Sequence, residues 1–86
     1  MYSFEHFIDD VKHGREIEFR INGVAYSVTN TKTGWQVAEN NRLIVSDVPD
    51  NDLMIEILKN EVVLNGKSMK AVFDDQLYDK NSLYIL

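Results

Sequence analysis

Residues 16–29 read EIEFRINGVAYSVT, in which apolar and polar residues alternate on both sides of Asn22-Gly23. Asn and Gly both tolerate positive φ, so this dipeptide favours the type I′ turn of a two-residue β-hairpin. Pairing across the turn gathers apolar residues on one face, and a slip of one residue would undo that segregation. The expected apolar pairs are Ile21 with Val24, Phe19 with Tyr26, and Ile17 with Val28.

The hairpin continues into a third strand and then a shorter fourth one. Residues 30–34, NTKTG, form a turn signal. With Thr31-Lys32 at the tip, Trp35 is expected opposite Val28 and Val37 opposite Tyr26, again on the apolar side. A further turn at residues 40–41 and an apolar run at residues 43–45 predict the fourth strand. The sheet is therefore an antiparallel meander of three to four strands.

A helix is predicted before the hairpin. Ser3 is a suitable N-cap, and Gly14 supplies the left-handed residue that ends a helix. The apolar residues between them recur at the i, i+3, i+4 and i+7 spacing of one helical face. They are Phe4, Phe7, Ile8 and Val11.

A second helix is predicted after Pro49, where the apolar period changes. Asp50 or Asp47 can cap it, and it runs to about Lys59. Its expected buried face consists of Leu53, Met54, Ile57 and Leu58.

Residues 61–75 leave two interpretations open. Ser68 can cap a short helix that turns Met69, Val72 and Phe73 inward, or the chain can form a hairpin across Asn65-Gly66. Residues 82–86 predict a final strand. The chain is thus expected to be a single α+β domain over residues 1–86: N-terminal helix, three- to four-stranded antiparallel meander, central helix, short C-terminal helix and strand.

The acidic charge is concentrated in one segment. Of a net charge of −5, residues 47–61 hold −4, because five acids face a single lysine. Such a field repels phosphate backbones and anionic membranes, so we expect another protein with a basic surface as the partner, and no direct nucleic acid or membrane contact. The alternative is a charged helix face that serves only solubility. The candidate protein-binding residues are Asp47, Asp50, Asp52, Glu56 and Glu61.

Catalytic and metal-binding patterns are missing from the sequence. His6 and His13 lie seven residues apart, about 10 Å along a helix, whereas a helical zinc pair needs i, i+4 spacing. No aspartate-rich stretch has the glycine of a calcium loop, and the glycines are too scattered for a phosphate loop. We therefore expect no catalytic residue, no metal and no cofactor. A metal-dependent or hydrolytic enzyme is the less favoured alternative.

Compartment and self-association are also expectations. The chain has no cysteine, no apolar run near the ~20 residues that span a bilayer, and an acidic rather than a basic start, which together favour a cytoplasmic protein. A small open sheet has exposed edges, so a homodimer and a homo-oligomeric structural role are alternatives. Tyr78 and Tyr84 have no periodic partner, which makes them candidates for exposed contacts.

Several turn and core motifs resemble those of small acidic proteins of low-GC Gram-positive bacteria, many of them encoded by phages or other mobile elements. The motifs are Phe4-x-x-Phe7-Ile8, Gly14-Arg15-Glu16-Ile17-Glu18-Phe19, Asn22-Gly23-Val24-Ala25-Tyr26 and Gly66-Lys67-Ser68-Met69. The resemblance implies an accessory partner protein, or an acidic inhibitor of a nucleic-acid-binding enzyme of the anti-CRISPR kind. It assigns no functional residue.

Overall fold

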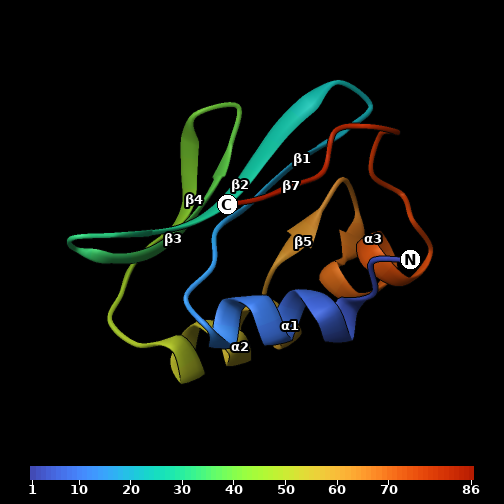
Figure 1. Cartoon of the computed structure of the whole chain (residues 1–86). Helices are drawn as coiled ribbons and strands as arrows, with labels where there is room; N and C mark the ends of the chain where they lie inside the picture. The colour runs from blue at the N-terminus through green and yellow to red at the C-terminus, as the bar shows by residue number, and fades with distance from the viewer.

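A computed structural model describes all 86 residues (Figure 1). It contains three helices, a five-stranded sheet and a two-stranded sheet. The elements in chain order are α1 (Phe4–Lys12), β1 (Ile17–Ile21), β2 (Val24–Thr31), β3 (Gly34–Glu39), β4 (Arg42–Val48), α2 (Asn51–Asn60), β5 (Val63–Leu64), β6 (Lys67–Ser68), α3 (Met69–Asp74) and β7 (Tyr84–Ile85).

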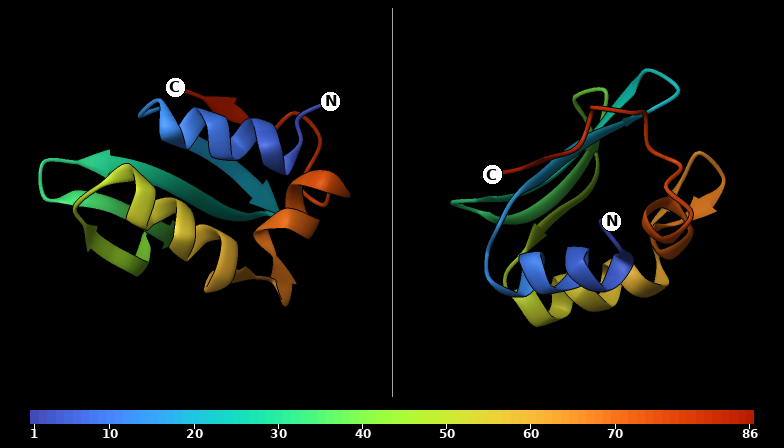
Figure 2. Two further views of the ribbon diagram at one scale, coloured as in Figure 1. Left: turned by 90° about the horizontal axis from the view of Figure 1, so that it is seen from below. Right: turned by 45° about the vertical axis from the view of Figure 1, so that its right-hand side comes forward.

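The molecule has two layers, with all three helices on one side of the large sheet (Figures 1 and 2). The sheet is antiparallel, in the strand order β4-β3-β2-β1-β7. Helices α1 and α2 lie side by side beneath it, and α3 packs at the end of α1. The predicted α+β class and element order are confirmed.

The β1–β2 hairpin has the predicted register. Ile17, Phe19 and Ile21 pair with Val28, Tyr26 and Val24 in turn, and the first of these pairs is completely buried. Asn22 and Gly23 both have positive φ, as a type I′ turn requires.

The predicted register between β2 and β3 is wrong by one position at the turn. Thr31 pairs with Gly34, so the tip is Lys32-Thr33 rather than Thr31-Lys32. Trp35 therefore lies opposite Asn30, and Val37 lies opposite Val28. The shift moves each pairing by two residues, and because side chains alternate with a period of two, the buried face is unchanged.

Strand β4 is longer than predicted and irregular. Its pairing with β3 shifts register twice, on either side of Val37, and Asp47 has a positive φ. At the Val48 end of β4, a Cβ on Gly34 would lie 2.6 Å from the carbonyl oxygen of Val48. Only glycine allows this approach of the two backbones.

Helix α1 begins and ends as predicted. The Ser3 side chain accepts from the His6 amide, and the His6 ring completes a capping box with the Ser3 backbone. Phe7 and Val11 are buried, while Phe4 and Ile8 lie at the margin of the core.

Helix α2 is capped by Asp50, one of the two predicted caps, whose carboxylate accepts from the Leu53 amide at 2.7 Å. Its predicted buried face is partly wrong. Met54 and Leu58 are buried, but Ile55 is buried as well, and Leu53 is 45% exposed. The helix is rotated toward Ile55 because it packs against α1 and α3, and the sequence pattern alone does not contain those contacts.

Asn51, the first residue of α2, connects three elements. Its side-chain oxygen Oδ1 accepts from the Trp35 indole at 2.7 Å, and its side-chain nitrogen Nδ2 donates to the backbone carbonyl of Lys12 at 3.1 Å. One side chain thus joins the sheet and the end of α1 to the start of α2.

Both interpretations of residues 61–75 are realised in succession. Strands β5 and β6 form a hairpin across Asn65-Gly66, and Ser68 then caps α3 by accepting from the Ala71 amide. The helix turns Met69, Val72 and Phe73 inward, as predicted.

The C-terminal strand β7 covers the β1 edge of the sheet over two residue pairs, Ile17 with Ile85 and Glu18 with Tyr84. The opposite edge, β4, has no neighbouring strand. None of the three helices has both the length and the apolar character needed to cross a membrane.

Candidate functional site

The acidic segment, defined as Asp47, Asp50, Asp52, Glu56 and Glu61, lies along α2 and the chain that enters and leaves it. Asp47 stands near the end of β4, and Asp50 and Glu61 are the two caps of the helix. Asp52 and Glu56 are i, i+4 neighbours on its outer face. All five side chains are exposed to solvent.

Two of these carboxylates have local structural roles. Asp50 caps the helix, and Glu56 accepts from the Asn60 side-chain amide at 3.1 Å. The carboxylates of Asp47, Asp52 and Glu61 form no hydrogen bond within the chain. Capping therefore accounts for only part of the charge in this segment.

None of the five carboxylates forms an ion pair. The ion pairs of the molecule all lie elsewhere and join His13 to Asp9, Arg15 to Asp10, Arg42 to Glu39, and Lys70 to Asp74. Lys59 is the one cation of the segment, and it is exposed and forms no ion pair either. The structure thus leaves the acidic segment as a set of solvent-facing negative charges without neutralising partners.

The histidines take part in local contacts on α1. His13 lies 3.6 Å from the Asp9 carboxylate, and its ring also contacts the Asp9 carbonyl. His6 contacts Ser3 in the capping box. Nowhere do three or more His, Cys, Asp or Glu side chains come together in a group that could hold a metal ion.

Tyrosines with shifted pKa values are bonded to carboxylates. Burial and the hydrogen bond to Glu39 raise the pKa of Tyr26 to about 12. Burial and a 2.6 Å hydrogen bond to Asp10 also raise the pKa of Tyr2. Tyr2 is partly buried and packs edge-on against Phe73 at the margin of the core.

Of the remaining predictions for aromatic residues, those for Trp35, Tyr26 and Tyr84 are confirmed and that for Tyr78 is wrong. Trp35 and Tyr26 are buried in the core between sheet and helices, as predicted. Tyr84 is 59% exposed, as predicted, whereas Tyr78 packs at the margin of the core beside Phe73.

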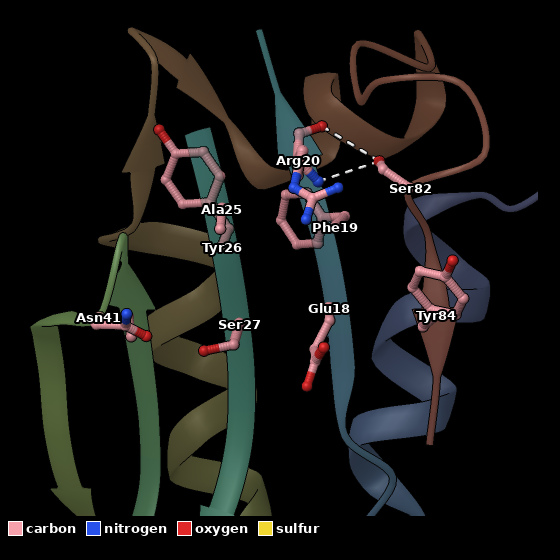
Figure 3. A pocket seen from close by; sticks show the side chains of 10 residues that line it. Glu18, Phe19, Arg20, Ala25, Tyr26, Ser27, Asn41, Ser82 and Tyr84 are labelled. Atoms are coloured by element: carbon pink, nitrogen blue, oxygen red, sulfur yellow. Dashed lines mark hydrogen bonds between the residues drawn. The ribbon is translucent and has the colours of Figure 1, made fainter. Parts of the chain in front are cut away.

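A hollow on the far side of the sheet was not predicted. It has a volume of about 220 Å³ and lies between the large side chains of β1 and β7 and the turn after β3 (Figure 3). The alternating pattern of β1 and β2 shows that their polar residues face away from the apolar side. The sequence does not show that β7 lies beside β1, and this pairing closes one side of the hollow. The outward-facing residues that line it are Glu18, Arg20, Ala25, Ser27, Ala38, Asn41, Ser82 and Tyr84.

Comparison with protein-family models, with curated proteins and with solved structures found no match.

Proposed function

We propose that this chain is a small non-catalytic protein-binding module that contacts a basic surface of another protein through its acidic segment. The observation that carries the proposal is the absence of neutralising partners. Elsewhere in the chain four acids are bonded to basic side chains, but none of the five in this segment is.

The energetics of the helix support the same conclusion. Asp52 and Glu56 repel one another at i, i+4, which costs a few tenths of a kcal/mol, and neither is needed to cap α2. Leu53, which is 45% exposed and follows Asp52 in the helix, adds apolar area beside the charged surface. Exposed charge with an adjacent apolar residue is suited to a protein surface, since charge guides the encounter and apolar burial adds affinity.

Within this proposal, the sequence resemblance suggests an accessory or inhibitor protein of a phage or mobile element. A basic groove that normally holds nucleic acid would then be the target, as for an anti-CRISPR-like inhibitor. The acidic segment would occupy the positions of phosphates.

The test is a paired charge reversal. The protein is used as bait, a recovered partner is purified, and its dissociation constant is measured with the wild type and with Asp52→Lys/Glu56→Lys at two salt concentrations. We expect the variant to fold and to bind at least about tenfold more weakly, and wild-type binding to weaken as salt rises.

The matched control is Glu5→Lys/Asp75→Lys, which makes the same change in net charge at exposed residues outside the segment. It should bind like the wild type. Equal binding by the wild type and the Asp52→Lys/Glu56→Lys variant would mean that the acidic segment serves solubility only.

A further inference from the structure

The face of the sheet opposite the helices has no covering layer (Figure 2). The strand register aligns its side chains in two rows across the strands. The first row consists of Tyr84, Glu18, Ser27, Ala38 and Leu43, each aligned with the next. The second row consists of Ser82, Arg20, Ala25 and Asn40, joined by the hydrogen bonds of Arg20 to Ser82 and of Asn40 to Ala25.

The two rows differ in side-chain size at their ends. The first row ends in two large exposed side chains, Tyr84 at 59% and Leu43 at 51% exposure. The second row begins with Ser82, which is 7% exposed, and continues with the exposed Arg20 and the small Ala25. The hollow of about 220 Å³ is lined by residues of both rows (Figure 3).

The rows also carry opposite charges. Glu18 is in the first row and Arg20 in the second, about 7 Å apart along β1. Both are exposed, and neither side chain forms an ion pair or a hydrogen bond within the chain. The two rows together are therefore neutral and contain one unpaired charge of each sign.

We propose that this face packs against the same face of a second copy of the chain, about a two-fold axis that crosses the strands at the level of Phe19. That rotation places each first row on the second row of the other copy. Glu18 then meets Arg20 of the second copy, and this pair occurs twice, as in any isologous interface. Tyr84 lies over the small Ser82 of the second copy and beside its Arg20.

The charges select this occupant over others. A uniformly basic or acidic partner would bring like charge to either Arg20 or Glu18, whereas a second copy pairs both. Pairing of two β4 edges is a poorer route to a dimer, because the two register shifts on that strand interrupt a regular edge. The helices remain outside the sheet-to-sheet contact, so this inference is independent of the proposed acidic segment.

The expected affinity of the dimer follows from the extent of the sheet face. Five strands at about 4.8 Å spacing give a face roughly 24 Å wide. The area that such a face can bury is near the small end of specific interfaces. Packed sheets cross at about 30°, so the contacts near the centre of the face, on β2 and on the neighbouring β1 with Glu18 and Arg20, keep the best alignment. We expect a reversible dimer with a dissociation constant on the order of micromolar.

The test is charge reversal with rescue. Sedimentation equilibrium is run over a concentration series on the wild type, on Glu18→Arg, on Arg20→Glu, and on the double variant that exchanges the two. Each single variant places like charges together at both pairs and should weaken the dimer at least about tenfold. The double variant restores opposite charges in the interface and should dimerise like the wild type.

Lys67→Glu is the matched control for Arg20→Glu, since it makes the same change of charge on the exposed β5–β6 hairpin and should leave the dimer intact. Circular dichroism and the thermal midpoint verify that each variant is folded. A wild type that stays monomeric at the highest concentration overturns the proposal. So does a dimer that survives either single reversal, which would place the interface on β4 or another surface, and so does a double variant that fails to dimerise.

Discussion

Asp79 holds the C-terminal segment against the first hairpin. Its two carboxylate oxygens accept from the amides of Asn22 and Gly23, both at 2.8 Å, and its own amide donates to the Arg20 carbonyl. The carbonyl of Asp79 accepts from the Ser82 hydroxyl, which also accepts from the Arg20 amide. The Asp79 side chain therefore bonds both amides of the turn, and its backbone holds the segment that leads into β7.

Replacement of Asp79 measures this contact. Asp79→Ala removes two charge-assisted hydrogen bonds at a partly exposed site where water partly replaces them, so we expect a loss of about 1–2 kcal/mol in the free energy of unfolding. Urea denaturation gives the value. Asp75→Ala, at an exposed carboxylate without a hydrogen bond, should change it by less than about 0.5 kcal/mol. Equal effects of the two substitutions would contradict the role given to Asp79.

Tyr26 makes the free energy of unfolding depend on pH in the alkaline range. Its pKa rises from an ordinary value near 10 to about 12 in the folded chain, because it is buried and donates to Glu39. A group that binds its proton more tightly when folded stabilises the fold below its unfolded pKa. That contribution is complete below pH 10 and is lost as the pH rises to about 12.

Urea denaturation of the wild type and of Tyr26→Phe across this interval checks the dependence. The wild type should lose stability more steeply with pH than the variant, since the variant has no proton to release at this position. Ultraviolet titration should show one fewer tyrosine that ionises late. Parallel pH profiles for the two proteins would show that the Tyr26 hydroxyl does not contribute.

At the scale of elements, α2 shows how packing selects a helical face. The apolar residues Leu53, Met54, Ile55, Ile57 and Leu58 are nearly contiguous, so several faces are compatible with the sequence alone. The Asn51 side chain, bonded to both Trp35 and Lys12, fixes the rotation at the start of the helix. Contact with α1 and α3 then buries Ile55 and leaves Leu53 in solvent.

Two alanine substitutions separate these alternatives. Ile55→Ala should cost about 2 kcal/mol or more, because it removes a buried side chain from the core. Leu53→Ala should cost less than about 1 kcal/mol, since the side chain is already 45% exposed. Both place alanine at an interior helical position, so differences in helix propensity are small. The reverse order in urea denaturation would mean that the helix presents the face predicted from the sequence.

At the scale of the molecule, the two layers give the chain two separate outer surfaces. The acidic segment lies on the helical side, and the paired rows with Glu18 and Arg20 lie on the open side of the sheet. A dimer formed through the sheet would present two acidic segments to solvent. A partner with two basic sites would then bind with avidity.

Chelation tests the expectation of a metal-free fold. No group of three potential ligands exists, and the core is formed by packed apolar side chains. EDTA should therefore leave the thermal midpoint unchanged, as measured by circular dichroism or calorimetry. A fall of several degrees that a single added metal reverses would contradict this expectation.

Elements whose signals lie within a few consecutive residues were predictable from the sequence. Asn22-Gly23 with strict alternation on both sides specifies turn type, register and buried face together, and Ser3, Asp50 and Ser68 each cap a helix within three residues. The position of the acidic segment was also readable, because it is a property of consecutive residues.

Tertiary structure decided what depends on residues far apart in the chain. The turn after β2 lies one residue beyond the predicted tip, because the polar run of residues 30–33 offers no unique register and Gly34 must accommodate Val48. The exposed position of Leu53 and the hollow on the sheet face depend on packing and on the pairing of β7 with β1. Such contacts are chosen by the free energy of the whole fold, which no local pattern contains.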